Sequence, residues 1–579
     1  MTEKKKAIIL LCLILLLAFA VNAAFLRNDS FFGDDYNFII NNLYIRSLRN
    51  IPSFFTSLAA GSSYRGTQVS YRPITTASFA LNYYLGGFDP LGYHIFNLLA
   101  HLFNIVMVFL IVRFITRQDF LALATALLFG LHPINSEVIN YINTRSSSFS
   151  VSFYLLSLYL FMLKFSPGSK GKSALCLAGS LAAYAAALFT KELSITLPLV
   201  IMAYYLIFRK KKLGEGIKET LLLYPPYFII SAVFMAIRYR LLKAEGLLEG
   251  AHHLYRNIYQ PARIFLYQLK VLAFPDLSLY YLDFNPSAHL DLRSGLSLAI
   301  ILLMLAGLLL LHLRSKRKDV IFFVYWVLIT ALPTTVVEMK VNFSLILDHR
   351  LYIMLVGAAF VGAALLHECA CGLKRRSGLD DMKVYAALVL IAVVIYSALY
   401  MGRNSVWRNG VTLGQDLVAR YPYSSGAHYV LGQGYMRGND PGMAVAAFRK
   451  AIELNPSNDA ARVNVSSRVN IAGILVQEGF LDGAMEEYKK VIVHDPSNSN
   501  AHFGLGYIFG SKGLYEEAIR EYEEGLAYNP GSLAARLNLA GIFLKTGLAS
   551  QAESEYRKAL EIDPANAEAL SKLESLGGL

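Results

Sequence analysis

Charged residues are scarce in this chain, and long apolar runs take their place. Only 16% of the 579 residues are Asp, Glu, Lys or Arg, whereas 55% are hydrophobic. A soluble protein of this length would expose more charge, so the composition predicts a multi-span membrane protein. Four cysteines are present, all in or beside apolar segments, and Cys369 and Cys371 lack partners at zinc-ligand spacing. A disulfide framework is therefore not expected.

Motifs for nucleotide chemistry are also missing. The chain has no Gly-rich phosphate loop, no Walker motif and no nucleophile elbow. The net charge is +13, but no basic, aromatic-interleaved domain stands apart from the apolar segments. We expect no nucleic-acid partner, because basic residues of membrane proteins collect in cytoplasmic loops and at the lipid surface.

The first part of the chain, 1–402, contains the apolar runs. About 20 residues are needed to cross the bilayer core, and eleven segments qualify as predicted transmembrane helices. They are 7–26, 93–115, 120–141, 148–164, 173–190, 192–208, 218–240, 293–313, 319–339, 347–366 and 383–402. We expect the first to be retained as a helix rather than cleaved as a signal peptide, and segment 256–274, with its charges and early proline, to lie in the membrane interface.

Basic clusters predict the orientation of these helices. With the N-terminus in the cytoplasm, the basic clusters between the segments fall on the cytoplasmic side. Arg238, Arg240 and Lys243 are the exception and are candidates for a function on the other side. The sequence thus predicts an integral protein of a bacterial cytoplasmic membrane or the endoplasmic reticulum, with everything after the last span outside the cytoplasm.

Ionisable residues at the outer ends of the segments form the candidate site. They are Asp34, Asp35, Arg72, His132, Glu137, Arg145, Lys191, Glu192, His349 and Arg350. Such residues are costly near a membrane and indicate function. The alternative for each is that it pairs with a neighbour to hold helices together.

These residue types fit a group transfer from an anionic carrier. Asp34 or Asp35 could take a proton from a hydroxyl acceptor. Glu137 is a further acidic candidate, and Asp35 and Glu137 could instead hold a divalent metal ion. Arginine and lysine match a departing phosphate, which predicts that Arg72, Arg145, Lys191 and Arg350 bind it. An activated donor outside the cytoplasm should be linked to lipid.

A repeat begins after the last apolar segment. Its prolines are spaced by 34, 40, 34 and 34 residues, at Pro422, Pro456, Pro496, Pro530 and Pro564. A period of 34 predicts four tetratricopeptide repeats over 423–579, joined to the membrane part by a linker, 403–422. The 40-residue interval contains an apparent duplication, 465–470, which should extend a helix or bulge from it. Stacked repeats form a groove for extended peptides, although a scaffold for partner proteins is the alternative.

The motifs together resemble the membrane O-mannosyltransferases that carry tetratricopeptide repeats, within the wider GT-C glycosyltransferases. The matching elements are Gly33-Asp34-Asp35 with Asn41, Tyr71-Arg72-Pro73-Ile74-Thr75, Tyr93-His94 with Asn97 and His101, His132-Pro133 with Glu137, Arg145, Lys191-Glu192, and His349-Arg350-Leu351-Tyr352. The resemblance covers nearly the whole chain.

The resemblance implies an all-α fold, a GT-C membrane domain followed by an α-solenoid. It also implies an inverting transfer of a sugar, mannose in that family, from a polyprenyl- or dolichyl-phosphate carrier to Ser or Thr hydroxyls of a polypeptide. The acidic pair would supply the base, and His132, Glu192 and His349 would join the cations around the donor. The family usually has Glu where this chain has His349, so a different sugar, a lipid or glycan acceptor, and a non-catalytic scaffold stay open.

Overall fold

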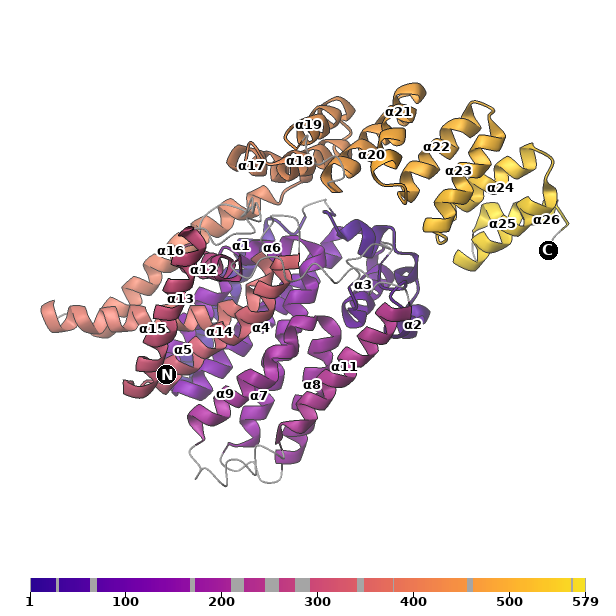
Figure 1. The fold of residues 1–579 in the computed structure, drawn as a ribbon. Helices are drawn as coiled ribbons and strands as arrows, with labels where there is room; N and C mark the ends of the chain where they lie inside the picture. Colours follow the sequence, from indigo (N-terminus) through magenta and orange to yellow (C-terminus); the bar gives the residue numbers. More distant parts are fainter. Residues whose placement is uncertain are drawn as a thin grey trace. The chain divides into compact units, whose positions relative to one another are not determined.

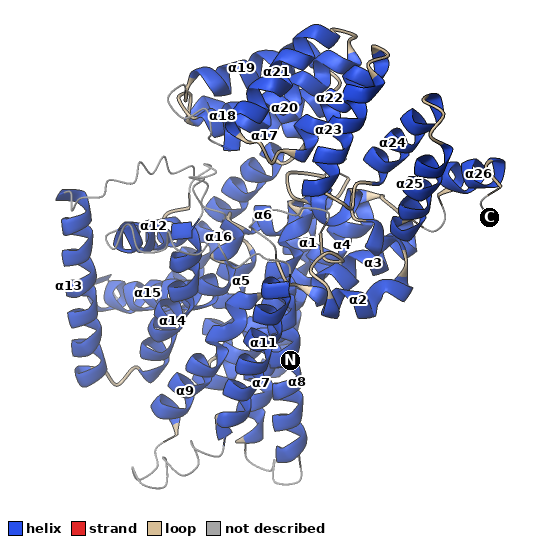
Figure 2. Cartoon of the chain, turned by 45° about the vertical axis from the view of Figure 1, so that its right-hand side comes forward, coloured by secondary structure: helices blue, strands red, loops and turns tan. Residues whose placement is uncertain are grey.

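The structure is a computed structural model that describes most of the chain. The described residues are 2–27, 31–62, 70–166, 172–209, 223–244, 260–275, 292–340, 348–377, 380–455, 462–563 and 566–577. Their contacts divide the chain into two compact units, Met1–Arg408 and Asn409–Leu579, which are best considered separately (Figure 1). Within the described ranges every regular element is a helix (Figure 2), which confirms the all-α prediction.

The first unit is a helical bundle in which long apolar helices predominate. Its α-helices are α1 (Glu3–Ala23), α2 (Ile51–Thr56), α3 (Pro73–Gly86), α4 (Pro90–Thr116), α5 (Asp119–Gly130), α6 (Asn135–Asn140), α7 (Arg145–Lys164), α8 (Ser173–Thr190), α9 (Leu197–Phe208), α11 (Pro225–Ala244), α12 (Gln260–Ala273), α13 (Leu292–Arg314), α14 (Lys318–Lys340), α15 (Tyr352–Ser377) and α16 (Asp381–Val406). Short 3-10 or π turns precede several of them, including η1 (Tyr36–Ile40), η4 (Ile142–Thr144), η5 (Glu192–Thr196) and η7 (Asp348–Arg350).

Eight helical stretches in the described part are long and apolar enough to cross a membrane. They are Lys4–Ala23, Pro90–Thr116, Ile142–Lys164, Ser173–Thr190, Gly295–Arg314, Lys318–Thr335, Tyr352–Arg375 and Asp381–Val406. Each coincides with a predicted span, so the polytopic membrane unit is confirmed. The count of eleven is not confirmed.

The predicted span 120–141 is interrupted. Helix α5 ends at Gly130, and His132-Pro133 forms a turn before the short α6. Proline at this point removes a backbone donor, and the Asn135 side chain donates to the Phe129 carbonyl at 2.6 Å in place of a helical hydrogen bond. The break directs α6 into the protein, where all six of its residues are buried.

Helix α12 lies within the predicted interfacial segment 256–274 and is too short to cross a bilayer. Its 14 residues would span only about 21 Å, less than the bilayer core. It packs against α14 through Gln268, which accepts a hydrogen bond from Thr335. Residues 256–259 of the predicted segment lie outside the described residues.

The second unit is a row of paired helices. Its elements are α17 (Gly410–Arg420), α18 (Ser425–Arg437), α19 (Pro441–Glu453), α20 (Arg462–Gln477), α21 (Leu481–His494), α22 (Ser499–Ser511), α23 (Tyr515–Tyr528), α24 (Leu533–Lys545), α25 (Ala549–Ile562) and α26 (Ala567–Ser575). The alanine at the same position of each second helix is fully buried, at Ala444, Ala484, Ala518 and Ala552. The aromatic side chains one turn later, Phe448, Tyr488, Tyr522 and Tyr556, are also buried, as the repeat pattern predicts.

The segment 403–422, predicted as a linker, is mostly helical. The end of α16 occupies its start, and α17 follows, capped by Asn409 and Thr412. Helix α17 lies very close to α18, because a Cβ built on Gly414 would come within 2.4 Å of the Leu431 Cα. The glycine permits this approach, so α17 acts as an additional packing helix of the second unit.

The duplication at 465–470 lies in α20. This helix has 16 residues, whereas the first helices of the other repeats, α18, α22 and α24, have 13. The structure thus shows the extended-helix alternative.

A repeated pair of polar side chains links the two helices of three repeats. Arg468 pairs with Glu487 at 2.8 Å, His502 with Glu521 at 2.7 Å, and Arg536 with Glu555 at 2.7 Å. The partners are 19 residues apart in every case. Arg536 and Glu555 are 13% and 10% exposed, so solvent screens this pair little, and we infer that it fixes the register of α24 on α25.

Removing one partner of this pair should loosen the last repeat. We expect Arg536→Met to lower the stability of α24 and α25 by about 1–3 kcal/mol, because it leaves the Glu555 carboxylate without its interhelical donor. Arg557→Met removes an exposed pair with Glu553 and should cost less than about 0.5 kcal/mol. Hydrogen–deuterium exchange of 533–562 in the full-length protein measures both; equal exchange in the two variants would contradict the proposed role.

Candidate active site

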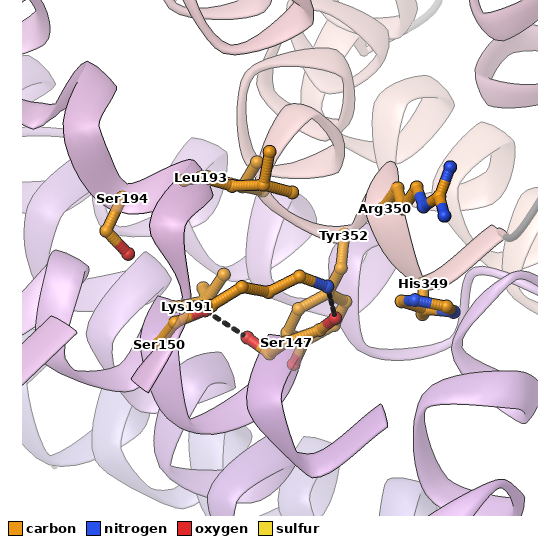
Figure 3. Close-up of a pocket in the computed structure, with 10 residues that line it drawn as sticks. Ser147, Ser150, Lys191, Leu193, Ser194, His349, Arg350 and Tyr352 are labelled. Carbon is orange, nitrogen blue, oxygen red and sulfur yellow. Dashed lines mark hydrogen bonds between the residues drawn. The ribbon is translucent and has the colours of Figure 1, made fainter. Parts of the chain in front are cut away.

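One pocket in the first unit lies where three breaks between helices meet. Its interior is small, with room for about one water molecule, and it is open on one side. Its lining comes from the start of α7, the α8–η5 junction and the η7–α15 junction, and the residues are Ser147, Ser150, Val151, Lys191, Leu193, Ser194, His349, Arg350, Tyr352 and Ile353 (Figure 3). Three predicted site residues, Lys191, His349 and Arg350, therefore share one pocket.

Lys191 points into the pocket from an extended residue between α8 and η5. Its side chain is 3% exposed, and its Nζ donates to the Ser147 hydroxyl at 2.6 Å. Burial lowers the pKa of Lys191 well below its usual value, and the nearby Arg72 and Arg350 charges lower it further, against the opposing effect of Glu192 and Glu137. An anion bound here would favour the protonated amine.

Arg72 and Glu192 form an ion pair beside the pocket. Arg72 directly precedes Pro73, the first residue of α3, and Glu192 begins η5. The Arg72 Nη2 and Nε atoms donate to the two Glu192 carboxylate oxygens at 2.9 and 3.3 Å. This two-point contact holds the α8–η5 junction against the start of α3, so Glu192 positions Arg72.

His349 and Glu137 form a second pair at the pocket edge. Glu137, on α6, accepts a hydrogen bond from the His349 ring at 2.7 Å and one from the His349 backbone N–H at 3.3 Å. Burial lowers the pKa of His349 well below its usual value, and Lys191, Arg350 and Arg72 lower it further. The ring is thus neutral at pH 7, with Nδ1–H donating to the carboxylate.

The two aspartates of the first loop have different surroundings. The Asp35 side chain is fully buried, and its oxygens accept from the Phe32 and Asn143 backbone N–H groups at 2.9 and 2.7 Å. Asp34 is exposed, and its backbone N–H donates to the Tyr141 hydroxyl at 3.0 Å. Asp35 therefore anchors the loop to η4, the turn that leads into α7, and Asp34 presents its carboxylate at the surface.

Tyr141 connects this loop electrostatically to the pocket. Burial raises the pKa of Tyr141 well above its usual value, and the charges of Asp34, Asp35 and Glu137 raise it further. Glu137 also acts on Lys191. The loop carboxylates and the pocket cations consequently belong to one network, with Tyr141 and Glu137 between them.

Two predicted site residues have structural roles. Arg145 is fully buried and donates to Asn97, Asn82, Ser78 and the Tyr93 carbonyl, and its guanidinium lies over the Phe79 ring at 4.8 Å. These contacts favour the helix-holding alternative over phosphate binding.

His132 likewise holds backbone rather than a ligand. Its Nδ1 accepts from the Ile134 N–H at 3.4 Å, and its Nε2 donates to the Leu272 carbonyl at 3.2 Å. These bonds tie the α5–α6 turn to α12. Neither ring nitrogen is directed to the pocket lining, which argues against the predicted substrate contact.

The proposed metal ligands do not fit a metal. Both Asp35 oxygens accept backbone hydrogen bonds, and both Glu137 oxygens accept from His349. Among the residues described here, no group of three or more His, Cys, Asp or Glu side chains is arranged to hold a metal ion. We derive no chemical step through a metal at these residues.

Sequence reasoning missed Ser147 and Tyr141 as parts of the site. Ser147 belongs to the run Ser146-Ser147-Ser148, directly after Arg145. Three small polar residues at the start of an apolar helix were a usable signal, because they leave room and hydrogen-bonding groups there. Tyr352 belongs to the matching element His349-Arg350-Leu351-Tyr352, but its place in the pocket lining depends on how α15 packs.

The structure thus defines a helical membrane protein with a polar pocket and a row of paired helices. Family models describe the second unit: Tetratricopeptide repeat at residues 511–576 and again at 425–458, and TPR repeat at 473–513. The tetratricopeptide prediction is confirmed. A solved structure of MamA is 20% identical with a TM-score of 0.24, covering 27% of this chain and 89% of that chain; the repeat assignment rests on the family models.

Curated relatives carry a common name. A Protein O-mannosyl-transferase tmtc2 of Xenopus laevis is 33% identical over 156 residues, 26% of this chain and 18% of that protein. Tmtc1 of Drosophila melanogaster is 32% identical over 132 residues, 22% and 15% of the two chains, and TMTC4 of Homo sapiens is 32% identical over 146 residues, 22% and 20%. The chain spans about a fifth or less of these relatives. The resemblance to O-mannosyltransferases is confirmed.

Replacing Arg145 should affect folding more than binding. We expect Arg145→Gln to lose roughly 3–5 kcal/mol of stability, because it leaves several buried acceptors without their donor. Arg350→Gln, at the pocket, should leave stability nearly unchanged. Size-exclusion profiles after heating in detergent compare them; an Arg145→Gln protein as heat-resistant as Arg350→Gln would contradict the structural role.

His132 should make stability depend on pH. Burial lowers the pKa of His132 to about 3, despite the opposing Leu272 carbonyl and with a further decrease from Arg403. Unfolded histidine binds a proton below about 6.5, whereas folded His132 does not, so stability should fall as pH drops from about 6.5 to 3, by up to about 1.4 kcal/mol per pH unit. His132→Gln should flatten the stability–pH curve in denaturant titrations; identical slopes would contradict this.

Proposed function

We propose that this protein is a membrane glycosyltransferase. It would move a sugar, mannose by analogy with the names of the relatives, from a polyprenyl- or dolichyl-phosphate carrier to Ser or Thr hydroxyls of a polypeptide. The observation that carries the proposal is that Lys191, Arg350 and His349 meet in one pocket, beside the Arg72–Glu192 pair. A cationic pocket in a membrane unit suits a phosphate on a lipid.

The donor phosphate would bind between Lys191 and Arg350. Within the described residues, the hydrogen bond of Lys191 goes to a neutral hydroxyl, so an anionic oxygen would be a stronger acceptor. Arg72 would add charge from the pocket rim while Glu192 holds it in place. Stabilising the departing phosphate is then an electrostatic task carried out by groups that are already oriented.

The acceptor would react on the Asp34 side. As the acceptor oxygen attacks the anomeric carbon, Asp34 takes its proton, the bond from that carbon to the phosphate oxygen breaks, and the phosphate leaves with the electron pair. Asp35 positions the loop and Tyr141 binds its backbone. His349 stays neutral and, held by Glu137, can present its second ring nitrogen to a sugar hydroxyl.

The tetratricopeptide repeats would bind the acceptor polypeptide. Stacked helix pairs commonly bind extended peptides. The basic clusters support a cytoplasmic N-terminus, and by the same rule the repeats would follow the last span on the extracytoplasmic side. A lipid-linked donor accounts for sugar activation where nucleotides are absent.

Substituting each aspartate in turn distinguishes the proposed base, Asp34, from Asp35, which anchors the loop. We expect Asp34→Asn to lower kcat by about 10²–10⁴-fold with unchanged stability, because it removes the base. Asp35→Asn should lower both activity and stability, since an amide nitrogen would face a backbone N–H. The measurement uses purified protein in detergent, radiolabelled polyprenyl-phosphate-mannose and a pool of extracytoplasmic proteins.

The location of the label identifies the acceptor. Label in protein supports the proposed function. Label in lipid or glycan would show that the acceptor is a lipid or glycan instead of a polypeptide. No donor consumption by wild-type protein with several sugar donors would overturn the enzyme assignment. Full activity of Asp34→Asn would show that another group is the base.

A further inference from the structure

One face of α11 follows α8 toward the candidate site. Its buried residues Tyr227, Ser231 and Phe234 recur at helical spacing. The Tyr227 and Ser231 hydroxyls lie 2.6 Å from those of Ser180 and Tyr184 on α8. The two helices thus run side by side, as Figure 1 also shows.

The contact continues to the end of α8. The Phe234 ring lies 5.4 Å from the Phe189 ring and 6.0 Å from the Tyr71 ring. Phe189 precedes Lys191 by two residues, and Tyr71 directly precedes Arg72. The α11 face therefore reaches the backbone from which the pocket cations project.

Arg238 is the next residue on this face, one turn after Phe234. It is partly buried, and its Nε atom is buried with no hydrogen-bond partner among the described residues. Its positive charge acts on the Glu192 carboxylate. Glu192 already binds Arg72 through both oxygens, so Arg238 adds a cation beside a pair that is neutral overall.

We propose that Arg238 binds the anionic phosphodiester of the lipid-linked donor, together with Lys191 and Arg350. This inference rests on the proposed function and adds a residue to its donor site. The Arg72–Glu192 pair contributes little net charge. Lys191, Arg350 and Arg238 together carry more positive charge than the single carboxylate of Glu137 at the pocket edge offsets. Arg238 is outside the residues that line the pocket, but its charge acts on Glu192 at the start of η5, and a donor phosphate that extends past η5 would reach it.

Arg240 provides a matched control on the same helix. It is exposed and lies two residues later, about 200° around the helix axis from Arg238. Arg238→Gln and Arg240→Gln thus remove the same charge from opposite faces. Arg238→Lys keeps the charge but loses the two-point geometry of a guanidinium.

Binding of farnesyl phosphate to the full-length protein in detergent tests the inference. We expect Arg238→Gln to weaken binding at least about 10-fold, because a charge-assisted contact is lost, Arg238→Lys to be intermediate and Arg240→Gln to match wild type. Equal weakening by Arg238→Gln and Arg240→Gln would overturn the inference. So would equal weakening of phosphatidylglycerol binding, which would indicate a general lipid anchor.

A measurement on wild-type protein avoids dependence on a variant that fails to fold. Farnesyl phosphate should protect Arg238, but not Arg240, from phenylglyoxal, as read by peptide mass spectrometry. No protection, or equal protection by inorganic phosphate, would overturn the assignment to a lipid-linked donor. Farnesyl phosphate carries no sugar, so its binding can be measured apart from transfer. Binding that depends on Arg238, in a protein without transferase activity, contradicts only the proposed function. Sugar transfer that does not depend on Arg238 contradicts only this inference.

Discussion

The cost of holding positive charge inside a membrane protein governs the first unit. A cation removed from water needs hydrogen-bond acceptors or an opposite charge. Without them, loss of the proton or a move to a solvated position is favoured. Arg145 satisfies this requirement entirely within the protein, through side-chain and carbonyl oxygens and surrounding rings. Arg72 satisfies most of it with Glu192. Among the hydrogen bonds described, Lys191 donates to a neutral hydroxyl. Burial, together with the nearby Arg72 and Arg350 charges, lowers its pKa.

Breaks between helices determine which side chains can meet. The α5–α6 turn at His132-Pro133 brings Glu137 inward, the α8–η5 junction presents Lys191, and η7 presents His349 and Arg350. A continuous helix would distribute such residues around its axis and along the membrane normal. Short turns instead bring several elements to one level, and hydrogen bonds such as those of His132 fix the turns in position.

The sequence was most informative where a pattern repeats. The 34-residue period located the buried alanines and aromatics of the second unit, because each repeat solves the same packing problem. Eight apolar runs corresponded to membrane-length helices, since length and hydropathy are local properties. Segment 120–141 was mispredicted as one span because hydropathy does not register a turn that proline and a side-chain hydrogen bond stabilise.

The site was predictable as a set of residues but not as an arrangement. Arg145 and Lys191 have similar positions near helix ends, yet Arg145 meets acceptors from α3 and α4, whereas Lys191 meets a serine. That difference depends on long-range packing, which composition and spacing do not encode. Tyr141 and Ser147 escaped notice because hydroxyl residues are common in membrane helices and gain significance only through their partners.

The uneven partnering of the cations has a thermodynamic consequence for a bound anion. A phosphate near Lys191 would raise the pKa of its amine, so anion binding would be coupled to proton uptake. Arg145, already matched by the protein, would gain little from the same anion. His349 is neutral and adds no positive charge that would attract the anion. The Glu137 carboxylate, which accepts a hydrogen bond from the His349 ring, repels additional negative charge in the pocket. Under the proposed function, this balance would direct the donor phosphate to the pocket rather than to the buried Arg145, whose hydrogen bonds are already made within the protein.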